Sequence, residues 1–327
     1  MEDSPLVSIA LCTYNGEKFL AAQLDTLMAQ TYKNLEVIAV DDCSTDGTYE
    51  ILKTYAAKYP WFRIYQNAQN LRFLKNFQVA VGYCKGDLIA LCDQDDLWHP
   101  EKIEMQVNAI GDNMFIYHDS EFINEDGTPV NQKVSDILNL YRGDSPEVFL
   151  FLNCVSGHSM LMKKELLAHA GSFEGYYHDW WLAYVATNIG SIDFLPQCLV
   201  QYRQHNASDT DMLQIKEKEE YTALTAQEET IKKKTWLEHC ANYAENKDPA
   251  FVKLLFRLYN DRPNRFFTFE LGRLMKEHID TLFFIQKKSP KYKLRKITKF
   301  MWGLKGRNFW YTYIRPNKNK VLNLNQL

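Results

Sequence analysis

The sequence lacks the motifs of several common enzyme classes. It contains no G-x-x-x-x-G-K-[ST] loop and no G-x-G-x-x-G turn, which disfavours a P-loop protein and a dinucleotide-binding protein. It has no H-E-x-x-H motif of a zinc protease. Residues 155–159, VSGHS, lack the second glycine of a G-x-S-x-G nucleophile elbow, which disfavours a serine hydrolase.

Disulfide pairs, a leader peptide and a membrane span are also not indicated. The seven cysteines form no C-x-x-C pair, and several lie in apolar runs, which favours buried thiols in a reducing cytosol. The first residues, MEDSPLVSIA, are acidic and have no long apolar region, so we expect no signal peptide. No run reaches about 18 apolar residues, so we expect no transmembrane helix.

Acidic residues are absent after Asp280, although twelve lysine and arginine residues follow it. The C-terminal segment therefore has a formal charge of +12, within a chain whose net charge is −3. Such an asymmetry indicates an anionic partner for this segment.

The same basic segment has an apolar stripe at helical spacing. The stripe consists of Leu294, Ile297, Met301 and Leu304. The basic residues beside it are Lys293, Lys296, Lys299 and Arg307, and the aromatic ones are Phe300, Trp302, Phe309 and Trp310. Because helices on anionic membranes have this composition, we predict that residues 288–327 bind such a surface. The alternative is a basic helix docked on the acidic body or on a partner. Nucleic acid is not expected, because no nucleic-acid-binding module accompanies the basic run.

Apolar strand patterns alternate with helical patterns through the first 123 residues. Strands are expected at 6–13, 35–42, 62–67, 87–94 and 114–123. This alternation predicts an α/β fold in which helices cover both faces of a parallel sheet. From about residue 211 the pattern is helical, so we expect one domain over 1–210 and a helical extension over 211–327.

Carboxylates cluster where two of the predicted strands end, which is the edge where open α/β sheets bind ligands. One cluster is Asp41–Asp42 and the other is Asp93, Asp95 and Asp96. Like charges repel, so such a cluster usually persists beside a positive group. The D-x-D spacing of Asp93 and Asp95 lets both carboxylates reach one Mg²⁺ ion. A solvated turn that caps the next helix is the alternative.

Several segments, in order along the chain, resemble glycosyltransferase family 2. They are VSIALCTYNGEKFL, IAVDDCSTDGT, KGDLIALCDQDDLW, SGHSMLMKKELL and HDWWL…YRQH. The resemblance covers roughly residues 6–208, and the DQDDLW and HDWW variants are most similar to bacterial polysaccharide rhamnosyltransferases. It implies the GT-A fold, a Rossmann-like and mostly parallel sheet flanked by helices. It also implies an inverting, nucleotide-sugar-dependent hexosyltransferase with Mg²⁺ or Mn²⁺ as cofactor.

The resemblance further implies roles for individual residues. The residues expected to bind the nucleotide sugar are Cys12, Thr13, Tyr14, Asn15, Asp41, Asp42, Asn70, Arg72, Lys75, Asn76, Asp93, Gln94 and Asp95. Asp95 and His205 are the expected metal ligands. Asp179 matches the catalytic base of the family's ED motif, with His178 in place of the usual Glu. The residues expected on the acceptor side are His158, His178, Trp180 and Trp181.

Each of these roles has a structural alternative. Asp41–Asp42 can cap a turn, and Asp179 can cap a helix whose tryptophans fill the core. His205 is as compatible with a structural or acceptor-facing role as with one beside the metal. His158 can simply be packed.

The chemistry required agrees with the residue types. A divalent cation neutralises the leaving diphosphate, and a carboxylate takes the proton of the acceptor hydroxyl. The expected donor is dTDP-rhamnose, with a UDP-hexose as the alternative. The expected acceptor is a growing lipid-linked bacterial glycan, which places the enzyme in the cytoplasm on the inner face of the plasma membrane. A catalytically inactive GT-A module that binds a glycan or a partner is the other alternative. It is disfavoured because Asp95 and Asp179 are both present.

Overall fold

The structure is a computed structural model that describes residues 4–173, 177–205, 212–213, 223–303 and 305–306. The chain divides into two compact units. Unit 1 consists of Met1–Asp144 and Cys154–Ile215, and unit 2 of Ser145–Asn153 and Lys216–Leu327. The predicted domain boundary at 210–211 lies outside the described residues.

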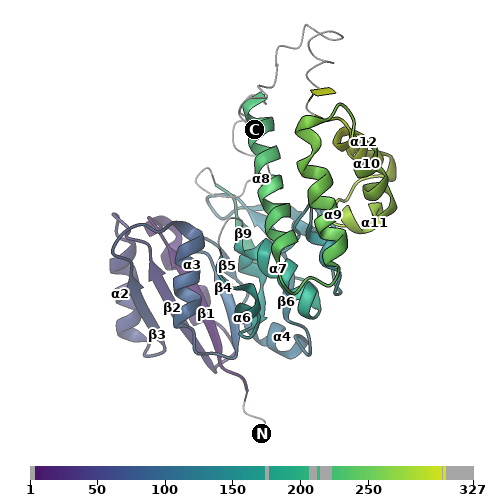
Figure 1. The fold of residues 1–327 in the computed structure, drawn as a ribbon. Helices are drawn as coiled ribbons and strands as arrows, with labels where there is room; N and C mark the ends of the chain where they lie inside the picture. The colour runs from purple at the N-terminus through teal and green to yellow at the C-terminus, as the bar shows by residue number, and fades with distance from the viewer. Residues whose placement is uncertain (1–3, 174–176, 206–211, 214–222, 304, 307–327) are drawn as a thin grey trace. The chain divides into compact units, whose positions relative to one another are not determined.

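The sheet of unit 1 begins with parallel strands in the order β3-β2-β1-β4 (Figure 1). They are β1 (Val7–Thr13), β2 (Leu35–Asp41), β3 (Phe62–Gln66) and β4 (Leu88–Cys92). Every residue of β1, β2 and β4 is buried, because helices cover both faces, and this is why these strands read as continuous apolar runs. The α/β fold and the first strands are therefore confirmed.

The sheet continues from β4 through short and mixed pairings, in the order β8-β6-β9-β5, with β7 paired to β6. The strands are β5 (Leu97–Trp98), β6 (Phe115–Ile123), β7 (Pro129–Lys133), β8 (Leu161–Lys163) and β9 (Ile192–Arg203). β6 and β9 run parallel, whereas β8 is antiparallel to both β4 and β6. The parallel pair β6–β9 brings the end of β9 to the edge where β4 ends.

Helices connect the strands of unit 1. They are α1 (Glu17–Met28), α2 (Thr48–Lys58), α3 (Arg72–Tyr83), α4 (Lys102–Ala109), α5 (Val134–Ile137), α6 (Leu166–Ala170), α7 (His178–Ile189) and the 3₁₀ turn η2 (Gly157–Ser159). Leu20, Leu24 and Leu27 of α1 recur at helical spacing and pack on the apolar strands.

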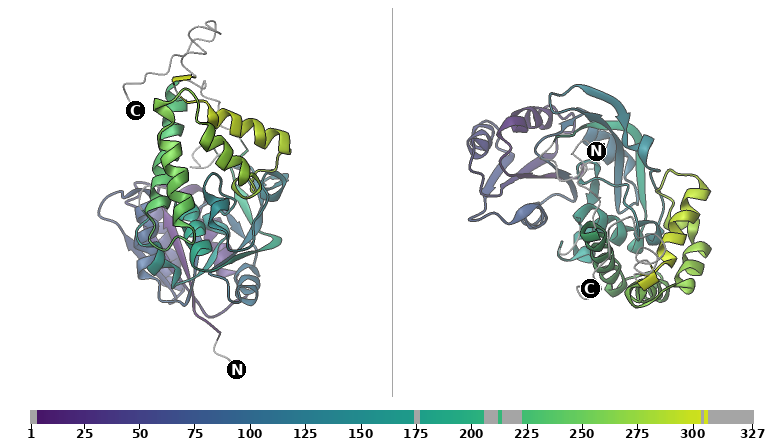
Figure 2. Two further views of the ribbon diagram at one scale, coloured as in Figure 1. Left: turned by 45° about the vertical axis from the view of Figure 1, so that its right-hand side comes forward. Right: turned by 90° about the horizontal axis from the view of Figure 1, so that it is seen from above.

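Unit 2 is helical in its described residues. Its elements are η1 (Pro146–Phe149), α8 (Ala223–Asn242), α9 (Pro249–Asn260), η3 (Arg262–Asn264), α10 (Phe269–Glu277), α11 (Ile279–Leu282) and α12 (Pro290–Met301). In Figure 2 these helices, coloured green to yellow, pack against one another. The buried Trp236 donates from Nε1 to the carbonyl of Leu150 at 3.1 Å. This contact joins the segment 145–153 to α8, which the sequence did not indicate.

Two of the four residues in the predicted apolar stripe of α12 pack inside unit 2. Ile297 is buried, and Met301 packs on Gly272 of α10, where a Cβ atom would lie 2.4 Å from the Met301 Cγ. Leu294 is 45% exposed, and Leu304, with residues 307–327, lies outside the described residues. Across the described part of the chain, no helix is both long enough and apolar enough to span a membrane.

Candidate active site

The loops that follow β1 and β4 are joined by the Gln94 side chain. Its Oε1 accepts a hydrogen bond from the backbone N–H of Tyr14 at 2.8 Å, and its Nε2 donates to the Tyr14 carbonyl at 3.0 Å. Gly16 permits this approach, because a Cβ there would lie 2.2 Å from Gln94 Oε1. Gln94, expected to bind nucleotide sugar, thus holds the loop on which Tyr14 is exposed.

Asp41 lies at the end of β2 and is completely buried. Its Oδ1 accepts from Thr13 Oγ1 at 3.0 Å and from Ser44 Oγ at 2.5 Å. Its Oδ2 accepts from the backbone N–H of Ser44 and from Gln66 Nε2, both at 3.0 Å. The carboxylate therefore organises the ends of β1, β2 and β3.

The neighbouring Asp42 has a similar role on the side of α3. Its Oδ1 accepts from Asn67 Nδ2 at 2.7 Å and from the backbone N–H of Leu71 at 2.8 Å. Asn76 is also buried, and its Nδ2 donates to the Val40 carbonyl at 3.0 Å. These side chains shape the loop ahead of α3.

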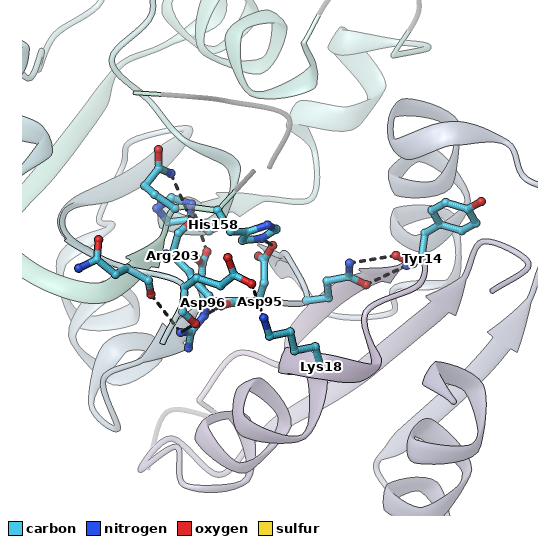
Figure 3. A network of polar contacts seen from close by, with 11 residues as sticks. Tyr14, Lys18, Asp95, Asp96, His158 and Arg203 are labelled. Atoms are coloured by element: carbon cyan, nitrogen blue, oxygen red, sulfur yellow. Dashed lines mark hydrogen bonds and ion pairs between the residues drawn. The ribbon is translucent and has the colours of Figure 1, made fainter. Parts of the chain in front are cut away.

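The acidic loop Asp93–Asp96 connects β4 to β5, and its partners come from the end of β9 (Figure 3). Oδ2 of Asp95 lies 2.9 Å from Nε2 of His205, and both side chains keep some exposed surface. The His205 ring packs on the Phe19 ring, with 5.1 Å between centroids. The two residues expected as metal ligands are thus brought together from positions 110 residues apart.

Arg203 fixes the shape of the acidic loop. Its Nε donates to the Asp95 carbonyl at 2.7 Å, and its backbone N–H donates to Asp96 Oδ1 at 2.9 Å. Its Nη1 reaches the Glu125 carbonyl at 2.9 Å. Figure 3 shows Arg203 beside Asp95 and Asp96. We did not predict this residue, and its only sequence signal is its place in the YRQH segment.

A second group of potential ligands lies deeper in the same loop. Asp93, Asp96 and His158 each offer a ligand atom, and these atoms all lie within 4.8 Å of one another. Oδ2 of the buried Asp96 accepts no hydrogen bond within the described residues and lies 3.4 Å from His158 Nδ1. Burial, together with the charges of Asp95 and Asp93, raises the pKa of Asp96. Burial lowers the pKa of His158 to about 3, which keeps its imidazole neutral.

These donor sets fit a divalent cation. Carboxylate oxygens are the ligands that Mg²⁺ prefers, and Mn²⁺ also takes imidazole nitrogen. The unbonded Asp96 Oδ2 and the adjacent acidic residues are a concentration of negative charge that a cation would stabilise. The site therefore offers two adjacent arrangements, Asp95 with His205, and Asp93 with Asp96 and His158.

Asp179 is a carboxylate in a different environment. It lies in the first turn of α7, and its Oδ1 accepts from the backbone N–H of Trp180 at 2.7 Å. Burial raises the pKa of its carboxyl group to about 7, although hydrogen bonds from Trp180 and Gly157 act in the opposite direction. The residue keeps part of its surface accessible. A carboxylate with a pKa near neutrality suits a general base.

Comparison with known proteins shows to which family this chain belongs. Residues 8–170 of the chain match the model of the family Glycosyl transferase family 2. An uncharacterized glycosyltransferase of Rickettsia typhi (strain ATCC VR-144 / Wilmington) is 30% identical over 231 residues, which are 68% of this chain and 70% of that protein. This chain belongs to glycosyl transferase family 2. It is therefore a glycosyltransferase, as the sequence predicted.

Two solved structures have a similar fold. Residues 1–349 of S. aureus TarS, in complex with UDP-GlcNAc, match with a TM-score of 0.52 and 16% identity, over 85% of this chain and 81% of that one. The mannosyltransferase PcManGT from Pyrobaculum calidifontis, in complex with GDP-Man and Mn²⁺, matches with a TM-score of 0.51 and 15% identity, over 91% and 80%. The likeness confirms the GT-A type of fold for this family 2 chain.

Other residues expected on the donor side lie around the strand ends. Cys12 is buried, and burial raises the pKa of its thiol. Asn15, with φ 46°, accepts from the Thr45 N–H at 2.8 Å. At the start of α3, Asn70, Arg72 and Lys75 are exposed. Arg72 has φ 66°, a conformation that is uncommon outside glycine and that concentrates at functional sites.

Three of the four residues expected on the acceptor side have buried side chains. His178 packs on Phe77, with 4.5 Å between ring centroids, and burial lowers its pKa to about 4. Trp181 donates from Nε1 to the Ala170 carbonyl at 2.8 Å. His158 contacts Ser120 Oγ at 3.0 Å through Nε2. Only Trp180, which is half-buried, keeps accessible surface.

Lys102 is a further residue near the acidic loop that the sequence did not reveal. It is completely buried at the start of α4, and its Nζ lies 3.4 Å from the centre of the Trp98 ring. Burial lowers its pKa to about 7, although the charge of Asp96 acts in the opposite direction. Lys102 Nζ donates no hydrogen bond to a carboxylate within the described residues, so Asp96 acts on it only through its charge.

Proposed function

We propose that this family 2 enzyme transfers a sugar from a nucleotide diphosphate to an acceptor hydroxyl in a single inverting displacement. The observation that carries the proposal is Asp179, whose carboxyl group has a pKa raised to about 7 by burial and yet stays partly accessible. Such a group is deprotonated at slightly alkaline pH and is basic enough to accept the proton of an attacking hydroxyl. A single displacement needs no second nucleophile.

The acidic loop is the proposed site of the leaving diphosphate and its cation. Asp95 and His205 are the first ligand pair, and Asp93, Asp96 and His158 are the second. Mg²⁺ or Mn²⁺ held there supplies positive charge that stabilises the departing diphosphate. Arg203 keeps the loop in place through the Asp95 carbonyl and the Asp96 carboxylate.

For the donor we propose dTDP-rhamnose, since the DQDDLW and HDWW segments are most similar to bacterial rhamnosyltransferases. A UDP-hexose is the second candidate, favoured by the fold of TarS, which was solved with UDP-GlcNAc. Tyr14, which is 46% exposed beside the strand ends, offers a ring for a nucleotide base.

The proposed acceptor is a hydroxyl of a growing, lipid-linked bacterial glycan. This places the enzyme at the inner face of the plasma membrane as a peripheral protein. The basic composition after Asp280 supports attraction to anionic lipid. Tethering at that surface raises the effective concentration of a lipid-linked acceptor.

The test is a panel of nucleotide sugars in a thermal-shift assay, with and without Mn²⁺ or Mg²⁺, followed by turnover assays with the donor that stabilises the protein. We expect dTDP-rhamnose to raise the melting temperature more than UDP-hexoses do, and the metal to increase the shift. Binding of a donor with no turnover on any glycan acceptor would instead support the inactive binding module.

A further inference from the structure

Unit 2 carries an unusual exposed aromatic cluster between η3 and α10. Phe266, Phe267 and Phe269 are 52%, 42% and 67% exposed. The rings of Phe267 and Phe269 stack at 5.5 Å, and Phe267 lies 4.5 Å from the Trp302 ring. Isolated exposed phenylalanines need no explanation, but neighbouring ones form an apolar patch of the kind that marks an interaction surface. We name residues 266–269 the aromatic loop.

The aromatic loop is held rigidly by the segment that follows α12. Thr268 donates from its backbone N–H to the Met301 carbonyl at 2.8 Å, and Gly303 donates to the Phe266 carbonyl at 3.0 Å. Phe267 and Trp302 form an antiparallel bridge between them. A Cβ on Gly303 would lie 1.9 Å from the Arg265 carbonyl oxygen, so this close contact requires glycine. The exposure of the rings is therefore built into the fold of unit 2.

The helix that ends at the aromatic loop has a basic face. Lys291, Arg295 and Lys299 of α12 are exposed, and their spacing of four residues places them on one side of the helix. Their charge is not balanced from within the segment, because no acidic residue follows Asp280. Near the aromatic loop, the basic side chains of Arg265 and Arg273 lie 3.9 Å from the carboxylates of Asp261 and Glu277.

We propose that the aromatic loop inserts into the interface of an anionic membrane while the basic face of α12 contacts the lipid headgroups. Phenylalanine side chains on an apolar face bury at the boundary between headgroups and acyl chains, and basic residues add attraction to anionic lipid. This proposal depends on the proposed function in one respect, because membrane binding would serve to hold the enzyme near a lipid-linked acceptor. It moves the apolar contact from the α12 stripe, whose Ile297 is buried, to the aromatic loop.

Co-sedimentation of the full chain with phosphatidylcholine vesicles, with and without 30% phosphatidylglycerol, tests the proposal. The wild type should bind the anionic vesicles, and Phe266→Ser with Phe269→Ser should weaken that binding about tenfold or more. Arg295→Gln with Lys299→Gln should weaken it about 20-fold at low salt and have little effect in high salt. Ile231→Ser, which changes a 43% exposed apolar residue elsewhere in unit 2, is the matched control and should bind as the wild type does.

Several outcomes would overturn the inference. Wild-type chain that stays in the supernatant excludes a lipid surface, and equal binding of the serine variant excludes the aromatic loop. Oligomers of the wild type that dissociate in the serine variant would assign the loop to a contact between copies. Thermal melting of each variant shows whether it is folded. If the serine variant is unfolded, the charge variant, which changes only exposed residues, tests the proposal in its place. Transfer to a short soluble acceptor, measured in parallel, tests the proposed function separately.

Discussion

Two acidic clusters of unit 1 look alike in the sequence but differ in how their oxygen atoms are used. Asp41 and Asp42 end β2, and hydrogen bonds from the chain itself stabilise their buried carboxylates. In the loop after β4, Asp96 Oδ2 accepts no hydrogen bond within the described residues. A carboxylate whose oxygens accept hydrogen bonds is part of the scaffold, whereas a buried carboxylate oxygen that accepts none, beside other carboxylates, can bind a cation.

The largest effect should come from the loop after β4. Asp95→Ala removes a carboxylate proposed to hold the metal and the diphosphate, so transfer should fall by about 10³-fold or more. Turnover assays over a range of Mn²⁺ and Mg²⁺ concentrations measure it. Asp112→Ala, which removes an exposed carboxylate elsewhere in unit 1, controls for general loss of charge. If Asp95→Ala keeps wild-type turnover, or if chelator leaves the wild type fully active, the loop does not hold a required cation.

Asp179 extends the comparison to a third kind of carboxylate, one that is buried yet partly accessible. Asp179→Asn keeps the shape but removes the base, so transfer should fall by about 10²-fold or more while donor binding stays nearly unchanged. Calorimetric titration of the donor and single-turnover rates separate the two effects. Weakened donor binding, or retention of most of the activity, would instead make Asp179 a structural helix cap.

The difference between the two acidic clusters could not be predicted from local sequence patterns. Strands β1, β2 and β4 were predictable because burial on both faces makes them continuous apolar runs. The clusters differ through partners far along the chain. Asp41 is satisfied by Gln66, and Asp95 meets a histidine 110 residues away. The resemblance to family 2 placed His205 beside Asp95, but local patterns do not contain the pairing of β9 with β6 and β5 that also brings Arg203 there.

The same limit explains the C-terminal helix. The spacing of Leu294, Ile297 and Met301 indicated an apolar face, which we expected to contact a membrane, but Ile297 is buried and Leu294 is 45% exposed. It did not indicate what covers that face, which for Ile297 and Met301 is the interior of unit 2. The aromatic loop went unnoticed because three phenylalanines in RFFTFE have no periodicity that separates exposed from buried rings.

The pH dependence of transfer should reflect the Asp179 environment. Its pKa of about 7 means that the base is mostly protonated at pH 6, so kcat/KM should fall about tenfold there relative to its plateau above pH 8. The sign for stability is opposite. Because the pKa of Asp179 is higher in the folded state than in the unfolded state, the folded protein binds more protons at this group. Its contribution to the free energy of unfolding therefore falls as pH rises from about 4 to about 7.

Steady-state rates between pH 5 and 9, at saturating metal, measure that profile. Mn²⁺ binding measured over the same range is the control, because burial also raises the pKa of Asp96 in the acidic loop. In Asp179→Asn, the fall of kcat/KM near pH 7 should be absent. A limb in wild-type enzyme that lies only below pH 5 would show that Asp179 behaves as an ordinary exposed carboxyl group.

The smallest effect on transfer should come from Asp41→Asn, and this variant tests the comparison from its other side. The new amide group would face donors from Thr13, Ser44 and Gln66, so a buried donor would lose its acceptor. We expect the free energy of unfolding to fall by about 2 kcal/mol, while the rate per folded molecule changes less than about threefold. Asp95→Asn should show the reverse, with stability nearly unchanged and transfer lost. Denaturant unfolding and transfer assays on both variants measure the change in stability and the change in rate separately. Loss of donor affinity in folded Asp41→Asn would make the β2 cluster part of the binding site, and the two acidic clusters would no longer differ in kind.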